Sequence, residues 1–250
     1  MRRVTSGNHP LVKHLVRLRQ NRDYRYEHKS LVIEGIKPVD ELGRHVRFKL
    51  IITYNEAMIP IGAEADEILI VNDTVMKKVS GMQAPEGLVV EIAMPEPASL
   101  EGLKYILALD GVGDPGNLGA LLRSALALGW QGVFILDDSC DPFNDKALRA
   151  ARGATFRLPL AWGSLEQLKE IVNANQLTPL VADINGTELS KLTDYKAVLL
   201  VMGNEAHGPS VGVKEFCQAI TIAMPGSMES LNVSVAGGIM MYALRSGKSR

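Results

Sequence analysis

Cysteine and aromatic side chains are scarce in this chain of 250 residues, and long apolar runs are missing. The two cysteines, Cys140 and Cys217, offer neither the spacing of a metal site nor a disulfide framework. No run approaches the roughly 20 apolar residues that cross a bilayer. The opening residues, MRRVTSGNHP, lack the apolar segment of a signal peptide. We therefore expect a cytoplasmic protein with no membrane partner and no metal.

Net charge is also nearly absent, but the charges are unevenly distributed. Residues 1–50 carry 12 Lys and Arg against 5 Asp and Glu, whereas the rest of the chain carries 15 against 23. Four of the five histidines, His9, His14, His28 and His45, lie in the same basic segment. A basic segment on an acidic body favours contact with a polyanion such as RNA or DNA, and an ordinary solvated basic helix is the alternative.

Predicted strands and helices alternate over the first 95 residues. The strands cover 31–33, 50–53, 67–71 and 88–93, and the helices cover 11–20, 75–79 and a stretch from Gly35 to Leu42. The two prolines of Pro95-Glu96-Pro97 then end the pattern. Such alternation is typical of a small α/β domain, so we expect domains at 1–95 and 99–250.

The predicted helix at 11–20 has an apolar face and a basic face. Its leucines share one side and its ionisable residues another, with Leu11, Leu15 and Leu18 on the first and Lys13, His14 and Arg17 on the second. Residues 21–30 are predicted to be a loop. This loop mixes cations with aromatic rings, as single-stranded RNA binders do, in Arg22, Tyr24, Arg25 and Tyr26.

The second half alternates more strongly and predicts a parallel sheet covered by helices. The strands cover 105–109, 133–136, 179–182, 197–202 and 220–224, and the helices cover 118–128, 145–152, 165–174 and 233–244. The strand at 105–109 shows no polar alternation, which is expected where both faces of a parallel sheet are buried. The fold class is therefore α/β.

The turn Gly111–Gly116 follows a predicted strand and matches the GxGxxG pattern of dinucleotide-binding folds. Asp137-Asp138 stands where such a fold places its ribose-binding acid. A pyrophosphate, however, needs bare backbone amides at a helix N-terminus. Here Asp110 and Asp114 add two negative charges, and Pro115 removes one amide donor. A dinucleotide oxidoreductase is therefore a minor alternative.

Two more stretches carry polar groups in loops. MGNEAHG, from Met202, turns sharply out of a predicted strand, and parallel sheets bind ligands at such carboxyl ends. Glu205 is the carboxylate of this loop. The residues Glu229 to Asn232 precede a run of small and apolar residues, and Ser230 or Asn232 could simply cap the last helix.

Taken in order, these stretches resemble a known family. Asp110 to Gly129, the MGNEAHG loop and Ile222 to Ala236 resemble the three signature motifs of the SpoU/TrmH branch of the SPOUT methyltransferases. Leu31 to Glu41 is similar to the ribosomal-protein-like RNA-binding domain that precedes the catalytic domain in many rRNA members. The resemblance covers nearly the whole chain.

The resemblance implies a fold, a reaction and a set of residues. It implies a C-terminal SPOUT domain with a deep trefoil knot, an obligate homodimer with active sites at the interface, and transfer of a methyl group from S-adenosylmethionine to a ribose 2′-hydroxyl of RNA. The catalytic residues carried over are Asn117, Arg123, Glu205, Ser230 and Asn232. The cofactor-binding residues are Met202, Gly203, Ile222, Met224 and Leu231.

The N-terminal domain favours 23S rRNA as the substrate, with no DNA partner, and tRNA is the nearest alternative. A non-catalytic RNA-binding module is the alternative from another class, but Asn117, Arg123 and Asn232 are all present. Two positions depart from the family pattern: Ala206 replaces a glycine, and Ile222-Ala223-Met224 replaces Ile-Pro-Met. Arg123 is the family's proposed base, but an arginine side chain does not give up its proton in proteins, so orienting the RNA is its alternative role.

Overall fold

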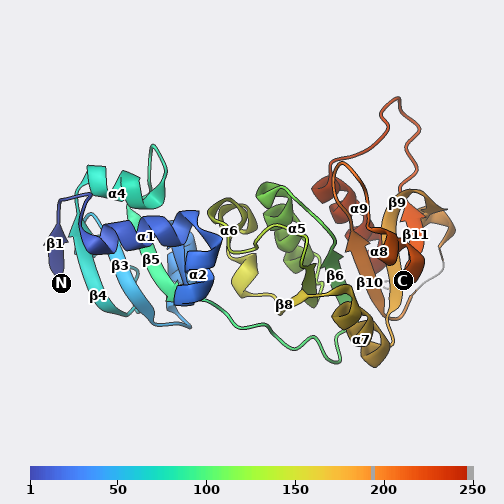
Figure 1. Ribbon diagram of the computed structural model, residues 1–250, viewed down its shortest axis with the longest axis horizontal. Helices are drawn as coiled ribbons and strands as arrows, with labels where there is room; N and C mark the ends of the chain where they lie inside the picture. Colours follow the sequence, from blue (N-terminus) through green and yellow to red (C-terminus); the bar gives the residue numbers. More distant parts are fainter. Residues whose placement is uncertain (193–194, 247–250) are drawn as a thin grey trace. The chain divides into compact units, whose positions relative to one another are not determined.

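The computed structural model describes residues 1–192 and 195–246, which form two compact units (Figure 1). The first unit comprises Met1–Glu96 and Phe143–Gly153, and the second comprises Pro97–Pro142 and Ala154–Arg250. We predict that residues 1–95 and 99–250 fold as independent domains, and this stays a prediction. None of the described helices is long and apolar enough to cross a membrane.

The first unit is built on a five-stranded mixed sheet with the order β1-β4-β3-β5-β2. Its strands are β1 (Arg2–Val4), β2 (Ser30–Glu34), β3 (Phe48–Thr53), β4 (Ala65–Val71) and β5 (Leu88–Ala93). The strand β4 runs parallel to β1 and β3, whereas β5 runs antiparallel to β2 and β3. The predicted strands are confirmed, and the short edge strand β1 is added to them.

The helices of the first unit are α1 (Pro10–Gln20), α2 (Arg22–His28), α3 (Ile36–Gly43), α4 (Asp73–Ser80) and α6 (Asp145–Ala151), with a 3-10 turn at Glu56–Met58. The helices α1 and α4 bury aliphatic side chains against one face of the sheet. In α1 the buried residues are Val12, Leu15 and Leu18. The apolar face was predicted to include Leu11, but Leu11 is only half-buried and Val12 is buried instead.

The prediction of a loop at residues 21–30 was wrong, because α2 fills most of it. Asn21 caps this helix by accepting a hydrogen bond from the backbone N–H of Tyr24. Arg25 is buried, and its guanidinium donates to the carbonyl oxygens of Leu18 and Arg19. Arg25 therefore ties α2 to the end of α1 and is not available to RNA.

The second unit contains a six-stranded sheet with the order β11-β9-β10-β6-β7-β8, and every neighbouring pair is parallel. The strands are β6 (Tyr105–Leu109), β7 (Gly132–Leu136), β8 (Leu160–Gly163), β9 (Thr178–Glu188), β10 (Val198–Met202) and β11 (Gln218–Thr221). β6, β7 and β10 are buried along their whole length. The prediction of a parallel sheet is confirmed.

The helices of the second unit are α5 (Pro115–Ala127), α7 (Leu165–Asn175), α8 (Val211–Phe216) and α9 (Val233–Ser246), with 3-10 turns at Ala154–Phe156 and Leu189–Lys191. Side chains of α7 and α8 share a buried cluster with alternate residues of the central strands, among them Ile106 and Ala108. The helices α5 and α9 pack against each other, with Gly237 against the buried side chain of Leu121.

Several boundaries differ from the sequence predictions. The helix predicted at 118–128 begins earlier, at Pro115, and the strand predicted at 220–224 ends at Thr221, so that Ile222 and Met224 lie in a loop. The strand β8 and the helix α8 were not predicted. Both are short, and Gly163 and Gly212 interrupt their periodicity.

Candidate active site

The first turn of α5 presents Asn117 at the carboxyl end of β6. Asp114 is the N-cap, because its side chain accepts a hydrogen bond of 2.9 Å from the backbone N–H of Asn117. Pro115 occupies the first helical position, where a missing N–H costs nothing. Because Asp114 caps the helix, the amide side chain of Asn117 is left for other contacts.

The carboxylate of Glu205 lies against the N-terminus of α5. It accepts hydrogen bonds from the backbone N–H groups of Gly113 (3.1 Å) and Asp114 (3.3 Å) and from the amide of Asn117 (2.9 Å). The exposed amides and the helix dipole favour an anion at this place. Here the protein supplies its own anion, so a pyrophosphate cannot occupy the same amides. This contact argues strongly against the dinucleotide alternative.

The pKa of Glu205 reflects the same contacts. Burial alone would raise the pKa of this carboxyl, but hydrogen bonds from Asn117 and from nearby backbone N–H groups outweigh burial and lower it below its usual value. Glu205 is therefore ionised at neutral pH and acts as a fixed acceptor.

Asn232 joins the third motif to the first. Its side-chain Nδ2 donates to Oδ1 of Asn117 at 3.0 Å. Its own Oδ1 accepts from the backbone N–H groups of Ser234 (2.9 Å) and Val235 (3.3 Å), which begin α9. The capping interpretation of Asn232 is therefore confirmed, and its role in catalysis stays a prediction. The result is a continuous chain of hydrogen bonds through Asn232, Asn117 and Glu205.

The loop after β10 is shaped by Asn204, which we did not predict as a site residue. Its Nδ2 donates to the carbonyl of Gly111 at 2.7 Å, and its Oδ1 accepts from the N–H groups of Ala206 and His207. A Cβ on Gly203 would lie 2.5 Å from the backbone nitrogen of Pro209, so the loop closes only with glycine there. An asparagine that follows a strand end and lies between two glycines, Gly203 and Gly208, is a sequence signal that could have identified this residue.

A cavity of about 690 Å³ opens beside this network. All five predicted cofactor-binding residues line it: Met202, Gly203, Ile222, Met224 and Leu231. Four of the five predicted catalytic residues line it as well: Asn117, Glu205, Ser230 and Asn232. Residues from all three motifs therefore converge on one cavity.

Arg123 does not line this cavity. It is exposed on α5, and it makes no hydrogen bond or ion pair within the described part of the chain. Arg123 follows Asn117 by six positions, which rotates its side chain by about 120° around the helix relative to Asn117 and moves it about 9 Å along the axis. The structure thus separates Arg123 from the other predicted catalytic residues of the same chain.

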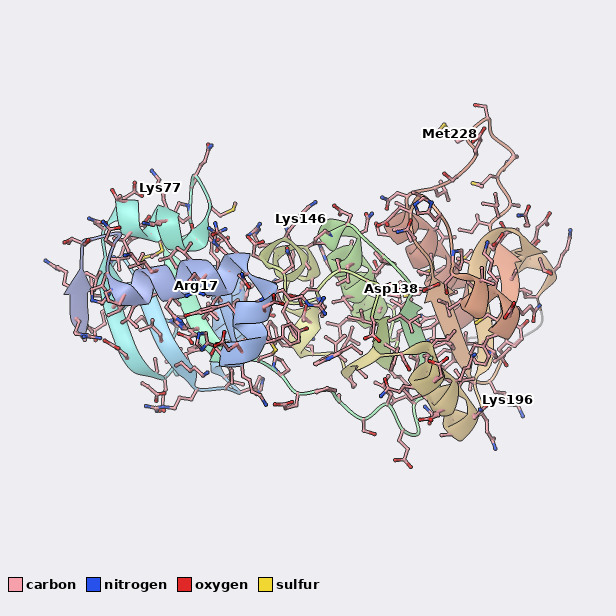
Figure 2. All side chains as sticks on the ribbon, viewed as in Figure 1. Arg17, Lys77, Asp138, Lys146, Lys196 and Met228 are labelled. Atoms are coloured by element: carbon pink, nitrogen blue, oxygen red, sulfur yellow. The ribbon has the colours of Figure 1, made fainter. Side chains whose placement is uncertain are left out.

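The loop between β11 and α9 is exposed to solvent. Ser230 and Leu231 lie in it, and Met228 near its tip is 74% exposed (Figure 2). His207, on the loop after β10, is also exposed, and its side chain makes no hydrogen bond or ion pair with the residues that the structure describes.

Asp183 and Lys214 form an ion pair that also lines the cavity and that sequence reasoning missed. Nζ of Lys214 lies 3.1 Å from Oδ2 of Asp183. The backbone N–H of Asn185 and then Lys214 lower the pKa of Asp183. Asp183 follows the apolar core of β9, a position that could have identified it. Within the described residues, no three His, Cys, Asp or Glu side chains gather into a potential metal site.

Known proteins share both units of this chain. The sequence profile of the SpoU rRNA Methylase family matches residues 104–242, and that of the MRM3-like substrate binding domain matches residues 9–90. The 23S rRNA (guanosine(2553)-2′-O)-methyltransferase RlmP of Bacillus subtilis (strain 168) is 28% identical over 98% of this chain and 100% of its own length.

Two further relatives agree with these matches. An uncharacterised tRNA/rRNA methyltransferase of Mycobacterium sp. (strain KMS) is 31% identical over 94% of this chain and 83% of its own length. The crystal structure of an AdoMet-bound rRNA methyltransferase from Sinorhizobium meliloti is 27% identical and superimposes with a TM-score of 0.86, over 99% of this chain and 98% of that one. The profile match spans more than half of the sequence, and the chain therefore belongs to the SpoU rRNA methylase family.

Proposed function

We propose that this protein transfers a methyl group from S-adenosylmethionine to a ribose 2′-hydroxyl of 23S rRNA. One observation carries the proposal: Asn117, Glu205 and Asn232, which lie far apart in the sequence, form one hydrogen-bonded network at the wall of a cavity. A non-catalytic RNA-binding module would have no need for this network.

The cavity fits an adenosyl cofactor. Its volume of about 690 Å³ lies within the usual range of small-molecule sites. One part of its wall is apolar, with Met202, Ile222, Met224, Leu231 and Met240, and another part is polar, with Asn117, Asp183, Glu205, Lys214, Ser230 and Asn232. Apolar surface suits the adenine ring, and carboxylates suit the positive charges of the sulfonium and ammonium groups. When bound, the cofactor supplies an already activated methyl group.

The protein's own task is to orient the acceptor hydroxyl. Glu205 holds the amide of Asn117, and Asn117 in turn holds the amide of Asn232, so each polar group keeps one orientation before RNA arrives. Fixed donors and acceptors contribute more than mobile ones, because alignment is not lost to side-chain rotation. Ser230, beside Asn232, lies within the cavity lining and can contact the ribose.

We include a homodimer in the proposal. Val235, Ile239 and Tyr242 are 50%, 41% and 63% exposed and follow one side of α9. An apolar stripe of this kind suits an isologous helix contact. Each cavity lacks the Arg123 of its own chain. In a dimer, the partner subunit's Arg123 would complete it. In that position Arg123 would bind an RNA phosphate and orient the ribose.

Support for rRNA over tRNA comes from the first unit and the relatives. Residues 9–90 match a substrate-binding domain, and RlmP, similar along its whole length, is named for methylation of 23S rRNA. The uncharacterised relative is named for both RNA classes, so tRNA is the outcome that the assay must distinguish.

Methyl transfer in vitro tests this function. Purified protein is incubated with methyl-labelled S-adenosylmethionine and unmodified 23S rRNA, and the digested nucleosides are separated by chromatography and mass spectrometry. We expect label in a 2′-O-methylnucleoside from 23S rRNA and its loss with Asn117→Ala. Lys104→Ala, which changes an exposed residue outside the cavity, is the control. Label on a base, or only in tRNA, would contradict the proposal.

A further inference from the structure

Several basic side chains of the first unit are already paired with carboxylates. In the part of the chain that the structure describes, seven cations form such ion pairs: Arg2 with Glu67, Arg19 with Asp145, Lys29 with Glu96, Arg44 with Asp40, Arg47 with Glu64 and Asp66, Lys77 with Asp73, and Arg149 with Asp145. The basic balance of the sequence therefore overstates the charge that is open to a polyanion.

The unpaired cations are concentrated on α1 and α2. Among residues 1–50, five exposed cations make no hydrogen bond or ion pair within the described part of the chain: Arg3, Lys13, Arg17, Arg22 and Lys37. Three of these five, Lys13, Arg17 and Arg22, lie within one short stretch. Lys13 and Arg17 are one helical turn apart on α1 and share a side (Figure 2 labels Arg17).

Arg17 lies over an aromatic cluster. Its guanidinium carbon is 4.0 Å from the centre of the Tyr24 ring. The rings of His14 and His28 pack edgewise on Tyr24, with centroids 5.6 and 3.9 Å away. We call Arg17, Tyr24, His14 and His28 the ring platform. Its outermost group, Arg17, is planar, cationic and exposed.

A buried carboxylate, that of Glu91, holds the His14 ring of the platform by a hydrogen bond. Glu91 on β5 is 7% exposed, and its Oε1 lies 3.3 Å from Nε2 of His14. The other ring nitrogen, Nδ1, lies 2.9 Å from the hydroxyl of Tyr24. A carboxylate can only accept, so Nε2 carries the proton, and in the neutral ring Nδ1 accepts from the Tyr24 hydroxyl. The ring of Tyr24 is thus held in place before any ligand binds.

We propose that the ring platform binds one unpaired RNA base, which stacks on the outer face of the Arg17 guanidinium, with a neighbouring phosphate at Lys13. Guanidinium planes and aromatic rings are the usual stacking partners of splayed-out bases, and a fixed platform loses little entropy on binding. The inference rests on the proposed function, since it assigns to the RNA substrate a contact remote in sequence from the three motifs.

The surrounding charges favour a single strand over a duplex. The exposed carboxylates Asp23 and Glu27 accompany Tyr24 on the short helix α2. They would repel a continuous line of phosphates, whereas a single stacked base needs only a local contact. A duplex bound through its backbone is therefore the competing outcome of the test.

Binding of a labelled oligonucleotide tests the platform. The probe is a single-stranded RNA of about 12 nucleotides with a central 2-aminopurine, whose fluorescence falls on stacking, and the same strand in a duplex is the comparison. The full-length protein is compared with Arg17→Lys, which keeps the charge but not the plane, and with Tyr24→Leu. Lys37→Gln, an exposed unpaired cation on α3, is the matched control.

We expect the wild type to prefer the single strand and to quench the probe. Arg17→Lys and Tyr24→Leu should each weaken single-strand binding about tenfold, while Lys37→Gln stays within about twofold. Arg17→Lys changes only an exposed side chain, so a folding defect in Tyr24→Leu does not decide the outcome. Arg17→Lys binding like the wild type, or equal losses for strand and duplex, would overturn the platform.

The same preparations separate this inference from the proposed function. If the wild type methylates rRNA and Arg17→Lys binds RNA like the wild type, then the ring platform is ruled out and the proposed function stands. Binding through Arg17 and Tyr24 without any methyl transfer means that the platform stands and the proposed function fails.

Discussion

At the scale of single residues, Glu205 links stability to pH. Its folded-state pKa lies below the unfolded value of 4.5. The ionised carboxylate therefore stabilises the fold fully above that value, and this contribution disappears as the pH falls through the folded-state pKa. We expect Glu205→Gln to melt below the wild type near pH 7, and the gap between the two melting temperatures to shrink as the pH falls below 4.5.

Calorimetry at several pH values measures this gap. Glu215→Gln is the matched control, because Glu215 is an exposed glutamate on α8 without a hydrogen bond in the described structure. A gap for Glu205→Gln that stays constant over the whole pH range would show that the carboxylate is not the stabilising group.

The two cysteines should be chemically inert in the native protein. Burial, followed by the negative charges of Asp141, Glu205 and Asp114, raises the pKa of Cys140 to about 12. Burial and then Asp110 raise the pKa of Cys217 to about 12. Since the thiolate is the reactive form, alkylation by iodoacetamide near pH 8 should be at least about a hundredfold slower than in the unfolded chain. Mass spectrometry showing equal native and unfolded rates would contradict this.

The sequence predicted the residues of the site better than their contacts. Asn117, Glu205 and Asn232 were predicted from ordered motifs, and the structure joins them. The pairing of Glu205 with the first turn of α5 spans 88 residues and depends on β6 and β10 being neighbours. Only the tertiary fold could therefore reveal that this carboxylate takes the anion position at the helix. The roles of these residues in catalysis stay predictions.

At the scale of elements, Gly237 and Gly238 on α9 make different demands on packing. A Cβ on Gly237 would collide with the buried side chain of Leu121 on α5, whereas a Cβ on Gly238 meets nothing within 4 Å. We expect Gly237→Ala to destabilise the fold by about 1–3 kcal/mol through overpacking. Gly238→Ala, the control, should stabilise it by up to about 1 kcal/mol through helix propensity.

Urea unfolding of both variants checks this comparison. A large loss for Gly237→Ala alone would confirm that the glycine is required for the close approach of α5 and α9. Equal losses for both variants would instead mean that the outer side of α9 is covered as tightly as its inner side.

Elements with strong periodicity were predicted well, and those that depend on tertiary contacts were not. The buried strand β6 and the long helix α7 lie where the pattern placed them. The helix α2 has few apolar residues, and its burial rests on Arg25, a residue type that usually marks a surface. The edge strand β1 has only three residues and forms because β4 provides a partner.

At the scale of the whole molecule, the proposed dimer predicts complementation between inactive variants. If Arg123 serves the partner's cavity, then Arg123→Ala and Asn117→Ala destroy different parts of each site. A mixed dimer has one site that retains both Asn117 and Arg123. We therefore expect each variant alone to be inactive, and co-refolded mixtures to regain methyl transfer at about half of the sites in each mixed dimer.

Light scattering accompanies this assay. The wild type should be a dimer at micromolar concentration, and Tyr242→Asp on the exposed stripe of α9 should shift it towards monomer. A stable wild-type monomer, or mixtures that remain inactive although mixed dimers form, would contradict a shared site. The dimer and the trefoil knot implied by the family stay predictions.

The most direct test of the central claim is a map of ribose methylation in cells with and without the gene. Sites of 2′-O-methylation in rRNA and tRNA are compared between the two strains and a strain that expresses Asn117→Ala. We predict that one 23S rRNA position loses its methyl group in the deletion strain, is restored by the wild-type gene and is not restored by Asn117→Ala. An unchanged rRNA map, or a loss confined to tRNA, would contradict the account.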